Sequence, residues 1–165
     1  MLRLALTALL ALTLPALAEQ SPRFADYPVA EIARTPVKKL PLPKADEDDD
    51  YRLRRYDSIT SDARANFAGR YFLTVWGCGT ACVNAAIVEA ASGQIIEIPF
   101  SVSGWRRVHT KFQGVEFRHN SRLVVFNGER NEDGDMGRHY YVLENGALRF
   151  LRSEKTSGDF MRGAR

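Results

Sequence analysis

The sequence has few cysteines and no long apolar run, and both shortages limit the kind of protein it encodes. Among its 165 residues there are two cysteines, Cys78 and Cys82, so the chain is not a disulfide-rich scaffold. The apolar run at residues 4–14 is much shorter than the roughly 20 residues that a membrane-spanning helix needs. The motif Gly-x-Ser-x-Gly does not occur, so a serine hydrolase of that type has no support.

The first 18 residues follow the plan of a secretory signal peptide. Arg3 gives the positive start, residues 4–14 form the apolar segment, and Ala16-Leu17-Ala18 is a small-residue cleavage site. No cysteine lies near the cleavage site to accept a lipid. We therefore expect cleavage after Ala18 and a periplasmic or secreted mature protein without a transmembrane segment.

Residues 19–50 differ in composition from the rest of the chain. They hold five of the seven prolines, end in the acidic run 46–50, and carry a charge balance of −3. Proline removes backbone donors and clustered carboxylates repel one another, so we expect a Pro-rich, acidic, extended arm. Apolar residues such as Phe24, Tyr27 and Val29 predict that part of the arm lies across the domain as a strap.

The remaining residues, 51–165, form one basic domain with a charge balance of +5. Arginine supplies 15 of its 17 cationic side chains, and a guanidinium group suits carboxylates and phosphates better than an ammonium group does. Codon usage is the alternative explanation for this excess. Export and charge favour an envelope polymer or a protein as the partner. They disfavour nucleic acid, for which the chain has no known module. The oligomeric state is left open.

Apolar and β-branched runs separated by turn residues predict three hairpins. The paired segments are 85–89 with 94–100, 115–118 with 122–127, and 138–144 with 147–152. Gly93 supplies the first turn, and Asn145-Gly146 in the third favours a tight two-residue turn.

Residues 58–69 predict a short helix, because they offer hydroxyl caps, alanines and a closing Gly69. Together with a strand at 71–76, the hairpins give about seven strands joined by short turns, which implies antiparallel pairing. The predicted fold is mainly β. It is an antiparallel meander of about seven strands, arranged as a curved sheet, an open barrel or a small sandwich, with one short helix and the extended amino-terminal arm.

Two motifs lie close together, Asn66-Phe67-Ala68-Gly69-Arg70-Tyr71 and Trp76-Gly77-Cys78-Gly79-Thr80-Ala81-Cys82. In these motifs the sequence resembles a family of small, uncharacterised secreted bacterial proteins with no established function. The likeness continues through residues 86–100, 120–130 and 139–141, and so covers most of the domain and little of the arm. The resemblance implies an exported β fold and implies no activity.

The spacing of Cys78 and Cys82 leaves two interpretations. In an oxidising compartment the two cysteines form a disulfide that holds a tight turn between strands. A redox-active pair usually has a two-residue spacer and a thiol of low pKa, whereas the spacer here is three residues long. We expect the structural disulfide. The alternative is a nucleophilic cysteine, and it excludes the disulfide because a bonded cysteine cannot attack a substrate. A nucleophilic cysteine needs a nearby base, and none of the histidines has a diagnostic spacing.

The candidate ligand-binding residues form two basic groups. An aromatic ring beside guanidinium groups can hold an anion or a sugar ring, and loops often carry binding residues. The groups are Trp105, Arg106, Arg107, His109 and Lys111, and then Arg130, Arg138 and His139. The alternative is that Trp105 belongs to the core and that the second group neutralises the neighbouring acidic loop.

Residues 129–135 alternate acidic side chains before a glycine, as a calcium loop does. Counting Glu129 as the first position places Tyr140 where a bidentate glutamate is required. We therefore expect a polar hairpin loop here, and we expect neither a metal nor a cofactor.

These observations favour a periplasmic or secreted, non-enzymatic binding module. A small periplasmic enzyme is the alternative, either a thiol oxidoreductase or a hydrolase. The hydrolase would draw its acid and base from a set of four side chains, Glu129, Asp133, His119 and His139. A third hypothesis is that the acidic run 46–50 covers the basic face and competes with an anionic ligand.

Overall fold

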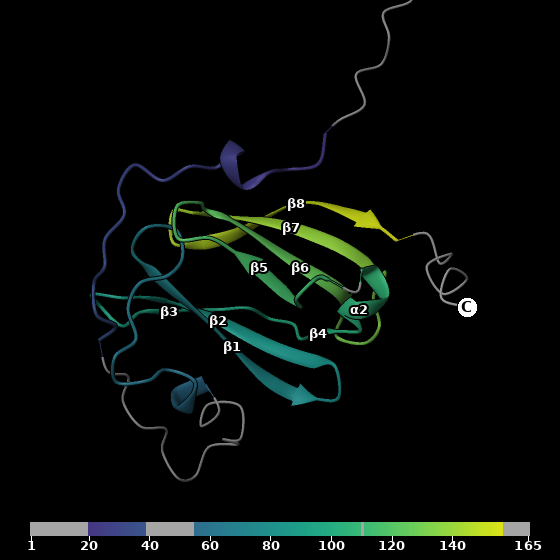
Figure 1. Ribbon diagram of the computed structural model, residues 1–165, viewed down its shortest axis with the longest axis horizontal. Coiled ribbons are helices and arrows are strands. Elements are labelled where there is room, and N and C mark those ends of the chain that lie inside the picture. Colours follow the sequence, from purple (N-terminus) through teal and green to yellow (C-terminus); the bar gives the residue numbers. More distant parts are fainter. Residues whose placement is uncertain (1–19, 39–54, 110, 157–165) are drawn as a thin grey trace, which may run out of the picture.

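The computed structural model describes residues 20–38, 55–109 and 111–156. Within them, eight antiparallel strands form one sheet, which confirms the predicted mainly β fold (Figure 1). The strands are β1 (Tyr71–Gly79), β2 (Cys82–Glu89), β3 (Ile95–Glu97), β4 (Val102–Ser103), β5 (Val115–Phe117), β6 (Leu123–Arg130), β7 (Gly137–Glu144) and β8 (Ala147–Lys155). A 3-10 helix, η1 (Phe24–Asp26), precedes the sheet, and the one-turn helix α2 (Trp105–Val108) lies between β4 and β5.

The three predicted hairpins are present as β2–β3, β5–β6 and β7–β8. Asn145 and Gly146 have φ angles of 51° and 76°, the left-handed values that a tight two-residue turn requires. There is one strand more than expected. The strand predicted at 94–100 is shorter, and the chain returns to β2 a second time as β4.

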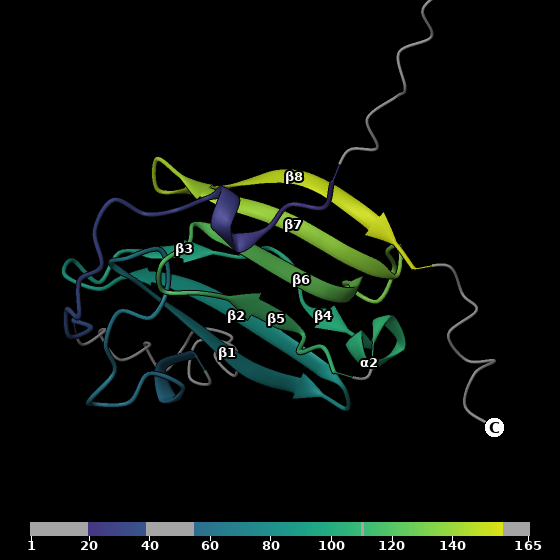
Figure 2. The same ribbon diagram turned by 45° about the horizontal axis from the view of Figure 1, so that its top comes forward.

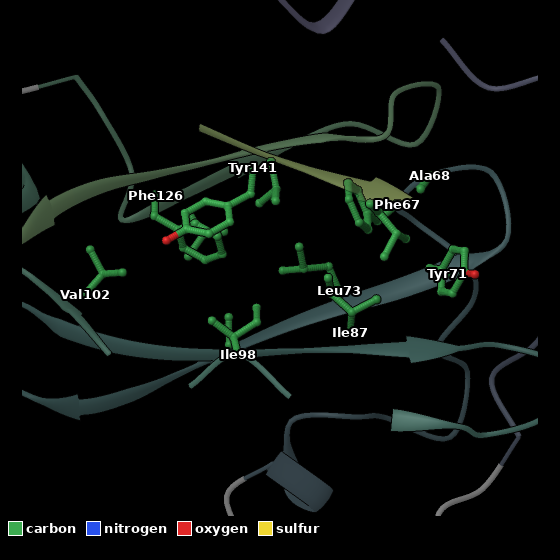
Figure 3. Close-up of a cluster of buried hydrophobic side chains, with 13 residues drawn as sticks. Phe67, Ala68, Tyr71, Leu73, Ile87, Ile98, Val102, Phe126 and Tyr141 are labelled. Atoms are coloured by element: carbon green, nitrogen blue, oxygen red, sulfur yellow. The ribbon is translucent and has the colours of Figure 1, made fainter. Parts of the chain in front are cut away.

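The sheet turns back on itself at β4, which pairs with the start of β2 and with the end of β6. As a result, the apolar faces of β1–β2 and β6–β7 lie opposite each other with the main core between them (Figure 3). Leu73 and Ile87 contribute to this core from one side, and Phe126 and Tyr141 from the other. Among the described strands, β1 and β8 do not pair with each other, so the sheet stays open.

Residues 20–38, here called the strap, lie against the domain as the apolar residues of the arm predict (Figure 2). The strap forms isolated β-bridges with Ser121 and Arg64. The rings of Phe24 and Tyr27 pack against a second, smaller apolar cluster of β6 and β7. This part of the arm is therefore a component of the fold, while the acidic run 46–50 lies outside the described residues.

The prediction of a helix at residues 58–69 is wrong. The chain is helical at 55–57 and then follows turns and isolated bridges up to β1. Thr60 bonds Asp62 through its hydroxyl, and Arg64 bridges to the strap. Hydrogen bonds to the strap and to β1 replace the intrahelical bonds that residues of this composition would otherwise form. Among the described residues, helical turns lie outside this segment, at 55–57, η1 and α2.

None of the described helices has the length and apolar character needed to cross a membrane. The predicted signal peptide, residues 1–18, lies outside the described residues and stays a prediction.

Candidate functional site

The two cysteines form the predicted disulfide. Cys78 and Cys82 are joined at the tip of the β1–β2 hairpin with their Cα atoms 5.1 Å apart, and Gly79 pairs directly with Cys82. Residues 77–81 are exposed, and Ala81 has a left-handed φ of 53°. The disulfide thus fixes the shape of a tight, exposed turn and fits an oxidising compartment.

Trp105, in the first predicted basic group, lines a groove between β1 and β5. Its ring is half-buried and packs on Gly114, where an added Cβ would be 3.1 Å from the ring atom Cε3. Arg106 and Arg107 follow Trp105 in α2 and are exposed. Trp105 therefore combines a packing role with an accessible surface, and the two guanidinium groups face solvent beside it.

His109, at the end of the same helix, is held locally. Its Nδ1 accepts a hydrogen bond from the backbone N–H of Lys111 at 3.1 Å, and its ring lies 4.9 Å from that of Phe112.

Arg138 of the second group is neutralised within the fold. Its Nη2 lies 3.3 Å from Glu116 and its Nε donates to Asn127 at 3.1 Å. The guanidinium also lies 4.6 Å from the centre of the Phe112 ring. These contacts fix Arg138 against β5 and β6.

Arg130 is half-buried among aromatic rings. Its Nη1 donates to the Tyr141 hydroxyl at 2.6 Å. Its guanidinium lies 5.8 Å from the centre of the Phe100 ring and 5.7 Å from that of Phe150, which is 47% exposed. Arg130 thus covers one open end of the core.

His139 is fully buried. Its Nε2 lies 3.0 Å from the carbonyl oxygen of Gly128, and its Nδ1 lies 2.7 Å from the hydroxyl of Ser153. Burial lowers the pKa of His139, because the charged imidazolium loses its hydration. Both ring nitrogens are thus engaged inside the sheet.

His119, the other histidine of the hydrolase hypothesis, contacts backbone. Its Nε2 lies 3.0 Å from the carbonyl oxygens of both Ala33 and Gly69, which ties the strap to the segment before β1. Glu129 lies in β6 and pairs with Ser103, and Asp133 is exposed in the following loop.

Residues 131–136 form the polar connection between β6 and β7 that the sequence predicts. Asn131 and Glu132 turn the chain with φ angles of 55° and 58°, and Asp135 pairs with Lys155 at 2.9 Å. Across the part of the chain that the structure describes, no three histidine, cysteine or acidic side chains are grouped closely enough to hold a metal ion.

A large cavity that was not among the predicted sites lies beside the strap. It has a volume of about 1110 Å³ and is here called the strap cleft, because strap residues 28–35 form one wall. The other walls are residues 68–71, the β2–β3 turn, Arg122 and the β7–β8 turn. The cleft therefore lies where the strap crosses between the two halves of the sheet.

Arg70 and Tyr71 form a hydrogen-bonded pair that lines the strap cleft. The Tyr71 ring closes one end of the core, and its hydroxyl points away from the other labelled side chains (Figure 3). The exposed Arg70 donates from Nη2 to this hydroxyl at 3.3 Å, and its guanidinium lies 5.4 Å from the ring centre. A guanidinium group has five N–H donors, so most of those on Arg70 stay available to a ligand.

Besides Arg70, the charged residues that line the strap cleft are three acidic residues, Glu31, Glu89 and Glu144, and a second arginine, Arg122. Hydrogen bonds from the Ser92 side chain and from the Ser92 backbone N–H, the latter at 2.7 Å, lower the pKa of the Glu89 carboxyl. Arg122 lies 3.4 Å from Glu144, and Arg149 lowers the pKa of Glu144 by a hydrogen bond at 2.9 Å. The cleft thus presents ionised acceptors beside the donors of Arg70.

A second, smaller groove lies between the edges of β1 and β5 and has a volume of about 490 Å³. Its walls are mostly apolar and include Phe72, Val75, Val83, Trp105 and Phe117.

Compared with known protein families, curated proteins and solved structures, the chain shows no significant match.

Proposed function

We propose that this protein is an exported, non-enzymatic binding module that holds an acidic sugar in the strap cleft. The observation that carries this proposal is the placement of the exposed Arg70 over the Tyr71 ring, where it lines a large cleft. A guanidinium group binds a carboxylate through two parallel hydrogen bonds. Contact with the Tyr71 ring already restricts the Arg70 side chain, so binding costs less conformational entropy.

The other walls of the strap cleft suit the rest of such a ligand. Ionised Glu89 and Glu144 accept hydrogen bonds from hydroxyl groups. Val29, Ile96 and Leu143 offer apolar surface for the C–H face of a sugar ring. A few polar groups in a partly apolar cleft are typical of small-molecule sites.

Location in the periplasm or outside the cell is part of the proposal. The signal-peptide pattern of residues 1–18 and the Cys78–Cys82 disulfide support it. Acidic sugars of envelope polymers are accessible ligands there.

Titration of the protein with glucuronate, followed by isothermal calorimetry, tests the proposal. We expect saturable binding of glucuronate and at least tenfold weaker binding of glucose, because a charge-assisted hydrogen bond contributes about 1.5–3 kcal/mol. Arg70→Gln should remove this preference. Arg107→Gln, which changes an exposed arginine of α2 outside the cleft, is the matched control and should leave binding unchanged. Equal binding by both variants, or no binding of glucuronate, would contradict the proposal.

A further inference from the structure

The edge of β1 that faces away from β2 is only partly covered. Tyr71 exchanges backbone hydrogen bonds with Phe67, and the side chain of Asn66 bonds both the N–H and the C=O of Leu73. Along an antiparallel edge strand, the backbone N–H and C=O groups of every second residue point away from the paired strand. Tyr71 and Leu73 are two such residues, so the backbone groups of Val75 also point away from β2. No further hydrogen bond among the described residues reaches the backbone of Val75, whose residue surface is 36% exposed.

The edge of β5 that faces away from β6 has the same property. The backbone N–H of Asn127 donates to the carbonyl of Gly114 at 2.9 Å, so Gly114 and Asn127 are a hydrogen-bonded pair of the antiparallel ladder. By the same alternation, Phe117 directs its backbone groups away from Val124, its partner on β6. Phe117 is half-buried, and it lines the same groove as Val75.

Two incompletely paired strand edges therefore border one apolar groove. An added strand would supply hydrogen-bond partners on both sides, and its apolar side chains would contact Phe72, Val83 and Trp105. Water can satisfy these backbone groups one at a time, whereas a strand matches the donors and acceptors of both edges together. The groove and the strap cleft have no lining residue in common.

The groove also has a charged end. Arg106 and Arg107 are exposed in α2 directly after Trp105, and Lys111 is exposed two residues before Gln113, which lines the groove. Three cations at this end favour acidic residues in the bound segment.

We propose that the groove between β1 and β5 binds an extended segment of a partner protein as an added β-strand, with acidic residues beside α2. The bound segment has alternating apolar residues, which fill the groove, and its backbone pairs with Val75 and Phe117.

The probe is a capped nonapeptide in which valine and threonine alternate and two aspartates close one end. Binding to the ¹⁵N-labelled, oxidised mature protein is followed by NMR. We expect amide exchange of Val75 and Phe117 to slow at least tenfold on binding, because both N–H groups gain partners. A peptide with lysines in place of the aspartates should bind three- to tenfold more weakly at low salt, and this difference should shrink in 1 M salt.

Val75→Pro removes the outward N–H, and proline is tolerated at strand edges. We expect it to weaken binding about tenfold, whereas Val75→Thr, the matched control, keeps the N–H and changes affinity less than about threefold. If Val75→Pro does not fold, a peptide with a central proline tests the same pairing on the unchanged protein. Equal binding of the proline peptide overturns the proposal, as does self-association through these amides without peptide, since the occupant would then be a second copy.

Discussion

The side-chain amide of Asn66 pairs with the backbone of Leu73 as a neighbouring strand would. Its Nδ2 donates to the Leu73 carbonyl at 3.1 Å, and its Oδ1 accepts from the Leu73 N–H at 2.7 Å. Leu73 is almost fully buried in the main core, so its backbone groups need partners within the protein. Asn66 therefore closes part of the β1 edge, and the edge becomes available again only at Val75.

Replacing Asn66 with alanine should lower the free energy of unfolding by about 1–3 kcal/mol, because two partly buried backbone groups lose their partners. Urea denaturation followed by circular dichroism measures this change. Asn120→Ala is the matched control, since the Asn120 side chain is exposed and only its backbone carbonyl is used by the strap. A loss for Asn66→Ala no greater than that of the control would contradict this role.

Gly69 holds the strap by its lack of a side chain. It has a left-handed φ of 78°, and an added Cβ would overlap the carbonyl oxygen of Glu31 in the strap. Gly146 has a similar φ of 76° with open space around the Cβ position, so Gly146→Ala measures backbone strain alone, about 1–2 kcal/mol.

Gly69→Ala should cost more stability than Gly146→Ala, because the clash is added to the strain. It should also release the strap, which speeds native-state trypsin cleavage after the exposed Arg34. Thermal unfolding and timed proteolysis of both variants test this. Equal cleavage rates would show that the approach of Gly69 to Glu31 does not hold the strap.

The sequence is sufficient to predict the hairpins, because their signals are local. Asn145-Gly146 adopts the turn that its dipeptide favours, and Cys78 and Cys82 are close along the chain. The helix prediction at 58–69 failed because the local signals there are overridden by distant partners, including the pairing of Asn66 with Leu73. The strap cleft is not predictable from one sequence. Its walls come from the strap, β1, the β2–β3 turn and the β7–β8 turn, which only the folded sheet brings together.

Loss of the disulfide should weaken the fold without abolishing it. Closing a loop as short as that between Cys78 and Cys82 contributes about 2 kcal/mol by chain entropy. The turn keeps other support, because Gly104 donates its backbone N–H to the Ala81 carbonyl at 2.9 Å and β4 pairs with Cys82. Urea denaturation with and without a phosphine reductant measures the difference. The double variant Cys78→Ser/Cys82→Ser should match the reduced protein and be insensitive to reductant, and complete unfolding of either would contradict this expectation.

Stability should fall as the pH drops from 7 to 5, and His139 should account for much of the change. Burial lowers the pKa of His139 in the folded protein below its unfolded value of about 6.5. Nearby Arg130 also disfavours the charged ring, whereas the Gly128 carbonyl and Asp135 favour it. Between the two pKa values the unfolded chain binds more protons than the folded one, so the contribution is complete above about pH 6.5 and is lost as the pH falls through the folded pKa.

Urea denaturation at pH 7, 6 and 5 measures this dependence, which for one such group is at most about 1.4 kcal/mol per pH unit. His139→Gln keeps a neutral hydrogen-bonding side chain and should flatten the profile, whatever its effect on stability at pH 7. His109→Gln changes a half-buried histidine at the end of α2 and should retain the slope of the unmodified protein. If His139→Gln keeps the full slope, the pH dependence belongs to other groups, and His139 is protonated as easily inside the sheet as in the unfolded chain.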